Sequence, residues 1–386
     1  MQAPVWTAES IRFAQDPATG AEIEQLTSQP VTSTNIYCEQ RYASADGSRI
    51  ALSRHPFGQP LELWVCDLRS LRLCRIGQGF AVGANSRLNA VYFLPQGEAQ
   101  ARLMRLDLIT LETRELFRFD GELPPAGAIS PDEKWYAAGP FPVRDNIFAL
   151  KRIELATGRT DTLCEIEDMS NPHLQFEPAE GRWLNVQINR GRRKDKTTGR
   201  DHLSGPLGAT LCAVDIETGK VVPLPAGRPH TPPISGHECW AGLTGQLLFT
   251  GGQYNVSASA YVTLQAPPEA EKDMPPAAIF SVRPGDAKAR VVAADKLYNH
   301  LGASDDGRFF IADDHATGSI YIGNIETGRK ARLCDSGTRQ GLCQYSHVHA
   351  YMTPDNRYVI YNSIVTGVGQ VYAARVPDGF LDALMK

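Results

Sequence analysis

The sequence lacks the features that mark secreted, membrane-bound or nucleic-acid-binding proteins. Residues 1–10 have neither a basic start nor an apolar core, so they do not resemble a signal peptide. No apolar run reaches the length of a membrane-spanning helix. Positive charge is not in excess, since 39 Lys and Arg face 43 Asp and Glu. We therefore expect a cytoplasmic protein with no nucleic-acid or membrane partner; the oligomeric state is left open.

Paired cysteines and the common catalytic motifs are also missing. The eight cysteines include no Cys-x-x-Cys pair, which favours reduced, mostly buried thiols over disulfides or a zinc knuckle. There is no Gly-x-Ser-x-Gly, no phosphate-binding Gly-Lys-Ser/Thr and no His-Glu-x-x-His. No long segment has a period of 3.6, which argues against a helical or α/β fold.

The chain does contain a repeated unit, in which a turn of small or acidic residues precedes an alternating apolar strand. Four clear copies and three looser ones bring the total to seven. The clear copies cover 44–52, 130–138, 304–312 and 353–361, and the looser ones lie near 95–97, 177–179 and 243–245.

A second unit, an apolar hairpin with a tight turn, follows the first. Residues 211–224 and 320–333 are examples, and others start near Leu63, Leu103, Phe148 and Ile279. Glycines in these turns supply the positive φ that hairpins require. Two hairpins every ~50 residues are typical of a four-stranded propeller blade. We predict an all-β fold, a seven-bladed β-propeller with four-stranded antiparallel blades, forming a single domain over 1–386.

The two ends of the chain are expected to close the ring together. Residues 16–27 resemble the second half of a blade whose first half lies at the C-terminus, and residues 370–372 resemble a third strand. An insertion at 189–207, in the fourth blade, holds the basic cluster. This cluster is either a solvated loop or a surface that faces an anionic ligand. Its members are Arg190, Arg192, Arg193, Lys194, Lys196 and Arg200.

Four histidines occupy equivalent positions in four consecutive blades. Each begins a first strand, about seven residues before that blade's turn; they are His173, His237, His300 and His349. First strands line the channel of a propeller, so these imidazoles should converge. His347 points to the same strand face as His349, and Gln344 lies within reach. Any one of them alone would be a hydrogen-bonded polar residue, but the cluster predicts a divalent metal site whose metal the ligands do not specify.

Four motifs make the chain resemble the oligogalacturonate lyases, polysaccharide lyase family 22. They are Asn171-Pro172-His173-Leu174-Gln175-Phe176, Gly236-His237-Glu238-Cys239-Trp240, Asn299-His300 and Gln344-x-x-His347-x-His349. The resemblance implies a seven-bladed propeller that cleaves short oligogalacturonides by β-elimination, with manganese as the cofactor. By motif, His300, Gln344, His347 and His349 would be metal ligands and His237 the general base.

One family feature is missing, and it concerns the substrate. The family has an arginine on a strand before the base, but the matching stretch 210–215 has none. Arg190, Arg192 or Arg193 could substitute, the substrate could be another uronate-containing sugar, or the protein could be an inactive relative. His173 either orients substrate or makes a plain hydrogen bond. Further side chains could contact sugar, although packing or solvation is the more general expectation for each; they are Arg228, Trp240, Tyr254 and Tyr345.

Two other functions stay open at this point. A propeller lactonase or other hydrolase would use the metal to activate water, but such sites usually need carboxylate ligands rather than imidazoles. A non-catalytic propeller that recognises a protein would show an exposed apolar patch and bind no metal.

Overall fold

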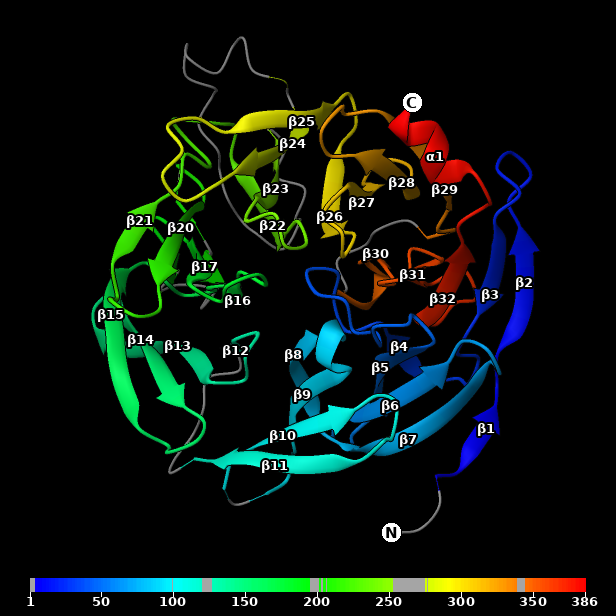
Figure 1. Ribbon diagram of the computed structural model, residues 1–386, viewed down its shortest axis with the longest axis horizontal. Coiled ribbons are helices and arrows are strands. Elements are labelled where there is room, and N and C mark those ends of the chain that lie inside the picture. Colours follow the sequence, from blue (N-terminus) through cyan, green and yellow to red (C-terminus); the bar gives the residue numbers. More distant parts are fainter. Residues whose placement is uncertain are drawn as a thin grey trace. The chain divides into compact units, whose positions relative to one another are not determined.

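The structure, a computed structural model, describes residues 4–98, 100–119, 127–194, 201–202, 204–205, 207–252, 275, 277–338 and 344–386. The chain forms two compact units, one of residues 1–122 and 300–386 and the other of residues 123–299. Each unit is built of antiparallel sheets (Figure 1).

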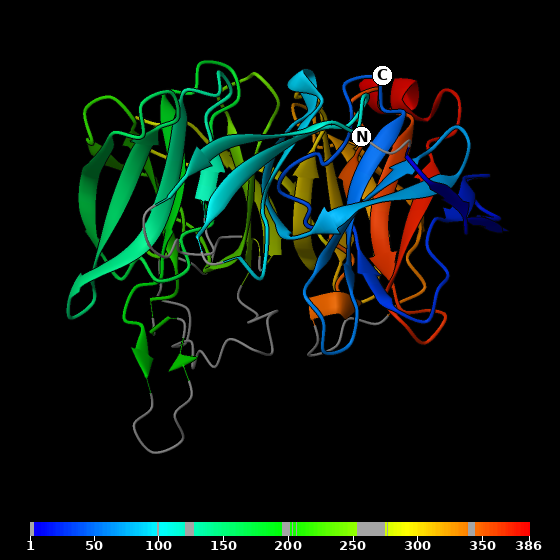
Figure 2. The same ribbon diagram turned by 90° about the horizontal axis from the view of Figure 1, so that it is seen from below.

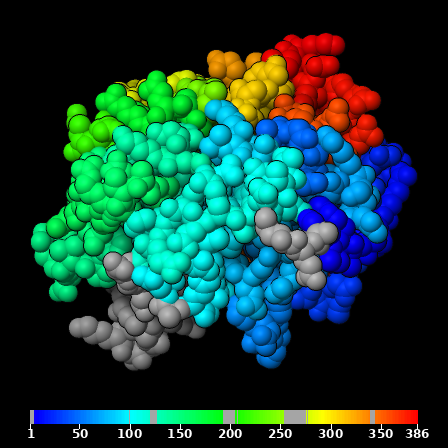
Figure 3. Space-filling model, turned by 60° about the horizontal axis from the view of Figure 1, so that its bottom comes forward, coloured from blue at the N-terminus to red at the C-terminus, as the bar shows by residue number. Residues whose placement is uncertain are grey.

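The first unit holds four sheets. The first has the order β1-β7-β6-β5-β4, with β1 (Trp6–Ala8), β4 (Thr32–Thr34), β5 (Arg49–His55), β6 (Glu62–Asp67) and β7 (Arg72–Gln78). The second is β8 (Phe80–Asn85), β9 (Ala90–Leu94), β10 (Arg102–Asp107) and β11 (Thr113–Arg118), whose outer strand β11 lies at the surface in Figure 3 (cyan). The third is β26 (Tyr298–Ala303), β27 (Phe309–Asp314), β28 (Ser319–Asn324) and β29 (Lys330–Asp335), with the unit boundary inside β26.

The fourth sheet of this unit joins the two ends of the chain. Its order is β2-β3-β32-β31-β30, with β2 (Ile11–Gln15), β3 (Glu22–Gln25), β30 (Tyr351–Met352), β31 (Tyr358–Ser363) and β32 (Gln370–Arg375). The unit also has helix α1 (Phe380–Met385) and the 3₁₀ turns η1 (Ser86–Leu88) and η3 (Gln344–Ser346). Over the described part of the chain, no helix is long and apolar enough to cross a bilayer.

The second unit holds three four-stranded sheets and a small ribbon. The sheets are β12 (Gly127–Ile129), β13 (Trp135–Arg144), β14 (Ile147–Glu154) and β15 (Thr160–Glu167); β16 (Gln175–Phe176), β17 (Trp183–Ile188), β20 (Thr210–Asp215) and β21 (Val221–Pro223); and β22 (Ile234–Trp240), β23 (Leu247–Gly252), β24 (Ala277–Val282) and β25 (Arg290–Ala294). The ribbon, β18 (Arg193–Lys194) and β19 (Asp201–His202), lies in the insertion between β17 and β20 and projects away from them (Figure 2).

Apolar side chains of neighbouring sheets form the cores. In the first unit, one cluster joins Ile50 and Leu52 of β5 to Val91 of β9 and Ile360 of β31, all fully buried. In the second unit, a cluster joins Leu150 of β14 to Leu184 of β17 and further residues of both sheets. Because neighbouring sheets within each unit pack their apolar faces together, burial of apolar surface stabilises each unit.

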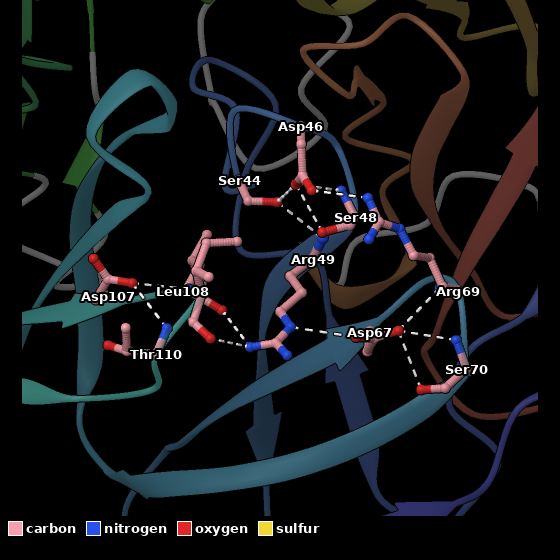
Figure 4. Close-up of polar contacts among 11 residues, drawn as sticks. Ser44, Asp46, Ser48, Arg49, Asp67, Arg69, Ser70, Asp107, Leu108 and Thr110 are labelled. Carbon is pink, nitrogen blue, oxygen red and sulfur yellow. Dashed lines mark hydrogen bonds and ion pairs between the residues drawn. The ribbon is translucent and has the colours of Figure 1, made fainter.

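Short polar turns connect the strands, and the same arrangement recurs. Ser44 Oγ donates to Asp46 Oδ1 at 2.7 Å, and this carboxylate accepts the Ser48 amide N–H (Figure 4). Ser130–Asp132, Ser304–Asp306 and Thr353–Asp355 repeat the first of these bonds. The sequence repeat is thus a turn fixed by side-chain hydrogen bonds to the backbone.

The fold class predicted from the repeats is confirmed: apart from α1 and the 3₁₀ turns, the regular elements of the described residues are strands, which form the seven sheets of a seven-bladed β-propeller. The shared sheet of the two termini is as expected. Two details differ. Two sheets have five strands instead of four, because β1 and β2 add to outer edges. The looser repeat at 95–97 lies after β9, and the turn between the first two strands of that sheet is η1.

The cysteines are also as expected. The seven that the structure describes are all free thiols, and six of them are buried. Cys343 lies outside the described residues.

Candidate functional site

Three of the predicted metal ligands gather in the first unit. One ring nitrogen from each of His300, His347 and His349 lies within 4.8 Å of the others. Nε2 of His300 is 3.3 Å from Nδ1 of His347, and the rings of His300 and His349 have centroids 4.3 Å apart. His300 and His349 are buried and His347 is half-buried. The structure therefore brings together three imidazoles that are separated by up to 49 residues in the sequence.

The backbone places these histidines differently from the prediction. His300 lies inside β26, but His347 follows η3, and His349 precedes β30 with a left-handed φ of 45°. The expectation that His347 and His349 share one face of a strand is wrong, because neither residue is in a strand. A 3₁₀ turn and a left-handed residue bring both rings to the same point instead. His173 also precedes its strand, β16, and has the same φ of 45°.

Gln344, the fourth predicted ligand, lies beside the histidines. It begins η3, and its side-chain Nε2 is 3.2 Å from Nε2 of His349. A rotation about the last side-chain bond exchanges the amide oxygen for the nitrogen, so the oxygen can take the same place.

The donor set fits a divalent metal ion. Metal–nitrogen bonds of about 2.1 Å place neighbouring ligand nitrogens about 3.0–3.4 Å apart. The 3.3 Å between His300 and His347 lies in that range. Burial, with the neighbouring His347 and His315 rings, lowers the pKa of His300 well below its usual range. His300 is therefore neutral near pH 7, the form in which imidazole ligates a metal.

Two residues near His300 were not identified from the sequence. Asp313, at the end of β27, accepts hydrogen bonds from both the backbone N–H and Nδ1 of His300. His315 follows in the next turn and is close enough to influence His300. The register of the β26–β27 hairpin, which places Asp313 opposite His300, could have identified the carboxylate.

His237, the predicted base, lies in the second unit on β22. The register of β22 against β23 shifts between Ile234 and Glu238, and Gly236 in this stretch has a positive φ of 85°. Such bulges redirect a side chain locally. The Ser235 hydroxyl lies 3.3 Å from Nδ1 of His237, and the same hydroxyl contacts Thr250. His237 is 8 % exposed.

His173 is surrounded by polar groups of the same unit. Its Nε2 lies 2.9 Å from the Asn171 amide nitrogen, and its Nδ1 lies 3.5 Å from a carboxylate oxygen of Glu238. Glu238 is fully buried and stands next to His237 in the sequence. The amide donates to Nε2, so Nδ1 carries the proton and faces the carboxylate. Glu238 belongs to the motif Gly236-His237-Glu238-Cys239-Trp240, but the motif alone does not predict its role.

The predicted substrate-binding arginines have different surroundings. The guanidinium of Arg190 donates to the backbone carbonyls of Leu207, Gly208, Ala209 and Arg228. A structural role, in which this side chain holds the insertion in place, therefore explains its position. Arg228 is 4 % exposed, and Arg192 is half-buried. Arg193 lies in β18, but its side chain is outside the described residues, as are Lys196 and Arg200.

The predicted aromatic contacts also differ from one another. Trp240 is 4 % exposed and its indole N–H donates to the Gln175 carbonyl, which favours a packing role over a sugar contact. Tyr345 is 39 % exposed and its ring packs on His55, with centroids 4.5 Å apart. Tyr254 lies outside the described residues. Tyr345 is thus the aromatic residue of this group that presents a ring to solvent.

Comparisons with known proteins agree with the motifs. No protein-family model matches the chain. It is 24% identical to an oligogalacturonide lyase from Pectobacterium atrosepticum, covering 94% of this chain and 95% of that protein. It is 23% identical to an oligogalacturonate lyase from Dickeya dadantii, covering 96% and 97% of the two chains.

A solved structure shares the fold. It is an oligogalacturonate lyase in complex with manganese, 19% identical, with a TM-score of 0.73 over 99% of this chain and 100% of the other. The resemblance first indicated by the histidine motifs thus extends over nearly the whole sequence and the whole fold. Over nearly its whole length, the chain is thus similar to oligogalacturonate lyases.

Proposed function

We propose that the protein is a metal-dependent lyase that cleaves short oligogalacturonides, or a related uronate-containing oligosaccharide, by β-elimination. The observation that supports it most directly is the group formed by His300, His347, His349 and Gln344. Near-full-length similarity to two curated lyases supports the reaction class. We infer a small acidic sugar as the substrate because the names of both relatives refer to oligogalacturonides.

These four residues would hold the cation, and manganese is the metal that we propose, because a similar solved structure is a manganese complex. A divalent cation neutralises the uronate carboxylate and thereby makes the neighbouring C–H proton more acidic. Three imidazoles and one amide oxygen leave coordination positions for substrate.

His237 is the proposed general base that removes the proton on C5. The Ser235 hydroxyl beside Nδ1 can accept a hydrogen bond from Nδ1–H. The proton then stays on Nδ1, and Nε2 keeps a lone pair for the substrate. A neutral imidazole suits this step because its pKa lies close to the working pH, and general base catalysis contributes about 10²–10⁴-fold. The oxygen on C4 leaves as the C4–C5 double bond forms.

Several side chains are proposed to position the sugar. Tyr345 offers an exposed ring against which a pyranose can pack. His173 can hydrogen-bond to substrate, and Arg192, Arg193 or Arg228 can pair with a uronate carboxylate in place of the family's missing arginine. Arg190 and Trp240 are the weakest members of the predicted set, because their polar groups already donate hydrogen bonds to backbone carbonyls.

We place the reaction in the cytoplasm. All seven described cysteines are free thiols, which is the usual state in a reducing compartment.

The test uses purified, EDTA-treated protein with digalacturonate or trigalacturonate. With Mn²⁺ restored, we expect an unsaturated product that absorbs in the ultraviolet, and no such product without metal. New reducing ends without this absorbance would indicate the hydrolase alternative. No turnover and no metal binding would favour the non-catalytic alternative.

A further inference from the structure

The Asp313 carboxylate stands directly behind His300 in the first unit. It is fully buried, and so is His300. Its Oδ1 accepts the backbone N–H of His300 at 2.9 Å and is 3.0 Å from Nδ1 of the same residue. One oxygen therefore fixes both the backbone and the ring of His300. Burying a carboxylate is costly, so such a group is kept where its hydrogen bonds serve a purpose.

This contact determines which nitrogen of His300 carries the proton. Oδ1 of Asp313 already accepts the backbone N–H of His300 and so acts as an acceptor, which requires Nδ1 to be the nitrogen that carries the proton. Nε2 then keeps its lone pair, and Nε2 is the atom that lies 3.3 Å from His347. The ring is thus oriented with its unprotonated nitrogen toward the other two histidines.

The equivalent positions of other sheets hold different residues. In each first hairpin, the backbone bond that closes the turn sets the register, as between Ser304 N–H and the Phe309 carbonyl. Counting four residues back from Ser304 gives His300, and counting four residues forward from Phe309 gives Asp313. These two residues therefore stand opposite each other. The same count places Gln187 opposite His173, Thr250 opposite His237 and Asn362 opposite His349. Among these four pairs, only the pair of His300 has an acidic residue at the opposite strand position.

We propose that Asp313 is a positioning residue that holds His300 in its Nδ1-protonated tautomer, so that Nε2 can ligate the divalent cation. This inference rests on the proposed metal site. A carboxylate behind a ligating histidine also raises the basicity of the ligand, and its removal typically lowers metal affinity about 10–100-fold. Asp313 itself does not touch substrate or metal.

The first test measures Mn²⁺ binding by titration calorimetry for the wild type, Asp313→Asn and Asp313→Ala. We expect the Kd to rise about 10–100-fold in both variants. Asp314→Asn is the matched control, because Asp314 is the next residue and is also buried, yet it caps the β27–β28 turn through Ala316 and Thr317. This variant should lose thermal stability and keep the wild-type Kd.

The second test observes the tautomer directly in metal-free protein. Nitrogen-15 NMR of the imidazoles should show His300 protonated on Nδ1 in the wild type, with Nε2–H appearing in Asp313→Asn. If Asp313 had only a structural role, the ratio of the Nδ1–H to the Nε2–H tautomer of His300 would be the same in the wild type and in Asp313→Asn.

Two results would overturn the inference alone: equal Mn²⁺ affinity of the wild type and both Asp313 variants, or a wild-type His300 protonated on Nε2. Failure of the wild type to bind Mn²⁺ at all would overturn the proposed metal site and this inference together.

Discussion

At the scale of single residues, hydrogen bonds decide what each imidazole can do. The Asp313 carboxylate leaves Nε2 of His300 unprotonated, and the Ser235 hydroxyl stands at Nδ1 of His237. His173 is oriented the other way, since the Asn171 amide lies at its Nε2. Three histidines from one sequence pattern thus have three different partners, which allows a ligand, a base and an orienting group to arise from the same position of the repeat.

Replacing His237 separates the base from the metal site. His237→Ala should abolish elimination, with loss of at least the ~10²–10⁴-fold that general base catalysis contributes. Mn²⁺ affinity should stay within about twofold, because the proposed ligands lie outside β22, in β26, in η3 and in the segment that precedes β30. Calorimetry and the ultraviolet assay together check this. Loss of Mn²⁺ binding in this variant would mean that His237 is a ligand and not the base.

Removing the Ser235 hydroxyl should weaken the base without removing it. A single neutral hydrogen bond contributes about 0.5–1.5 kcal/mol, so kcat of Ser235→Ala should fall about three- to tenfold. The KM should change little, because the hydroxyl contacts His237 and Thr250 and has no proposed role toward sugar. Ser235→Thr, which restores a hydroxyl, should recover most of the kcat. An unchanged kcat in the alanine variant would rule out this role.

The sequence predicted the candidate ligands because histidine is rare in the chain and recurs at one position of the repeat. It did not predict Asp313, because this residue is one of 43 acidic residues and becomes distinctive only through strand pairing. The left-handed φ of His349 was also not predictable, since it depends on the packing around η3.

At the scale of elements, the turns determine how closely neighbouring sheets approach. Arg49 of β5 pairs with Asp67 and reaches the carbonyl of Leu108 in the next sheet (Figure 4). Asp67 and Asp107 each cap the two backbone N–H groups that follow them, at i+2 and i+3. Six of the seven predicted first turns were placed correctly, because Asp and Gly specify these turns locally. The seventh was misplaced because η1 replaces the turn motif in that sheet.

Two Thr-Gly turns provide a matched test of whether glycine is needed only for its positive φ or also because a Cβ would not fit. Gly219 and Gly20 have φ values of +72° and +75°. A Cβ on Gly219 would overlap the Leu163 carbonyl oxygen, whereas a Cβ on Gly20 would meet nothing within 4 Å. Gly20→Ala should cost only the ~1–2 kcal/mol of a left-handed alanine, and Gly219→Ala clearly more. Denaturant unfolding measures both; equal losses would show that the Leu163 contact is absent.

At the scale of the whole molecule, the N-terminal segment ties two sheets of the first unit together. β1 adds to the sheet of β4–β7, and β2 and β3 add to the sheet of β30–β32. Between β1 and β2, Glu9 pairs with the buried Arg54 at 2.6 Å and accepts the backbone N–H groups of Ser28 and Gln29. The shared sheet was predictable from the repeat, but β1 was not, because three residues at an edge give no periodic pattern.

The Glu9–Arg54 pair should contribute stability in a pH-dependent way. Burial alone would raise the pKa of Glu9, but the hydrogen bonds from Arg54, Gln29 and Ser28 outweigh it and lower the pKa. The contribution is therefore full above the unfolded-state pKa of about 4.3 and is lost as the pH falls below it. Glu9→Gln should cost about 3 kcal/mol at pH 7, as for other broken buried pairs.

Unfolding at pH 7 and pH 3 checks this, with a smaller difference from the wild type expected at pH 3. Glu22→Gln is the control, because Glu22 makes an exposed pair with Arg12 that should contribute less than about 1 kcal/mol. A Glu9 variant no less stable than the Glu22 variant would contradict the proposed importance of the buried pair.

The pairing of β3 with β32 has a consequence for synthesis on the ribosome. Ile23 pairs with Ala374, so β3 gains this partner only after about 350 further residues have been synthesised. Until then one edge of the short strand β3 stays unpaired, and closing a loop of this length has a high entropic cost. Unpaired strand edges are sites of aggregation. A chain released before residue 370 would therefore keep an unpaired, aggregation-prone strand edge, and its solubility would depend on chaperones.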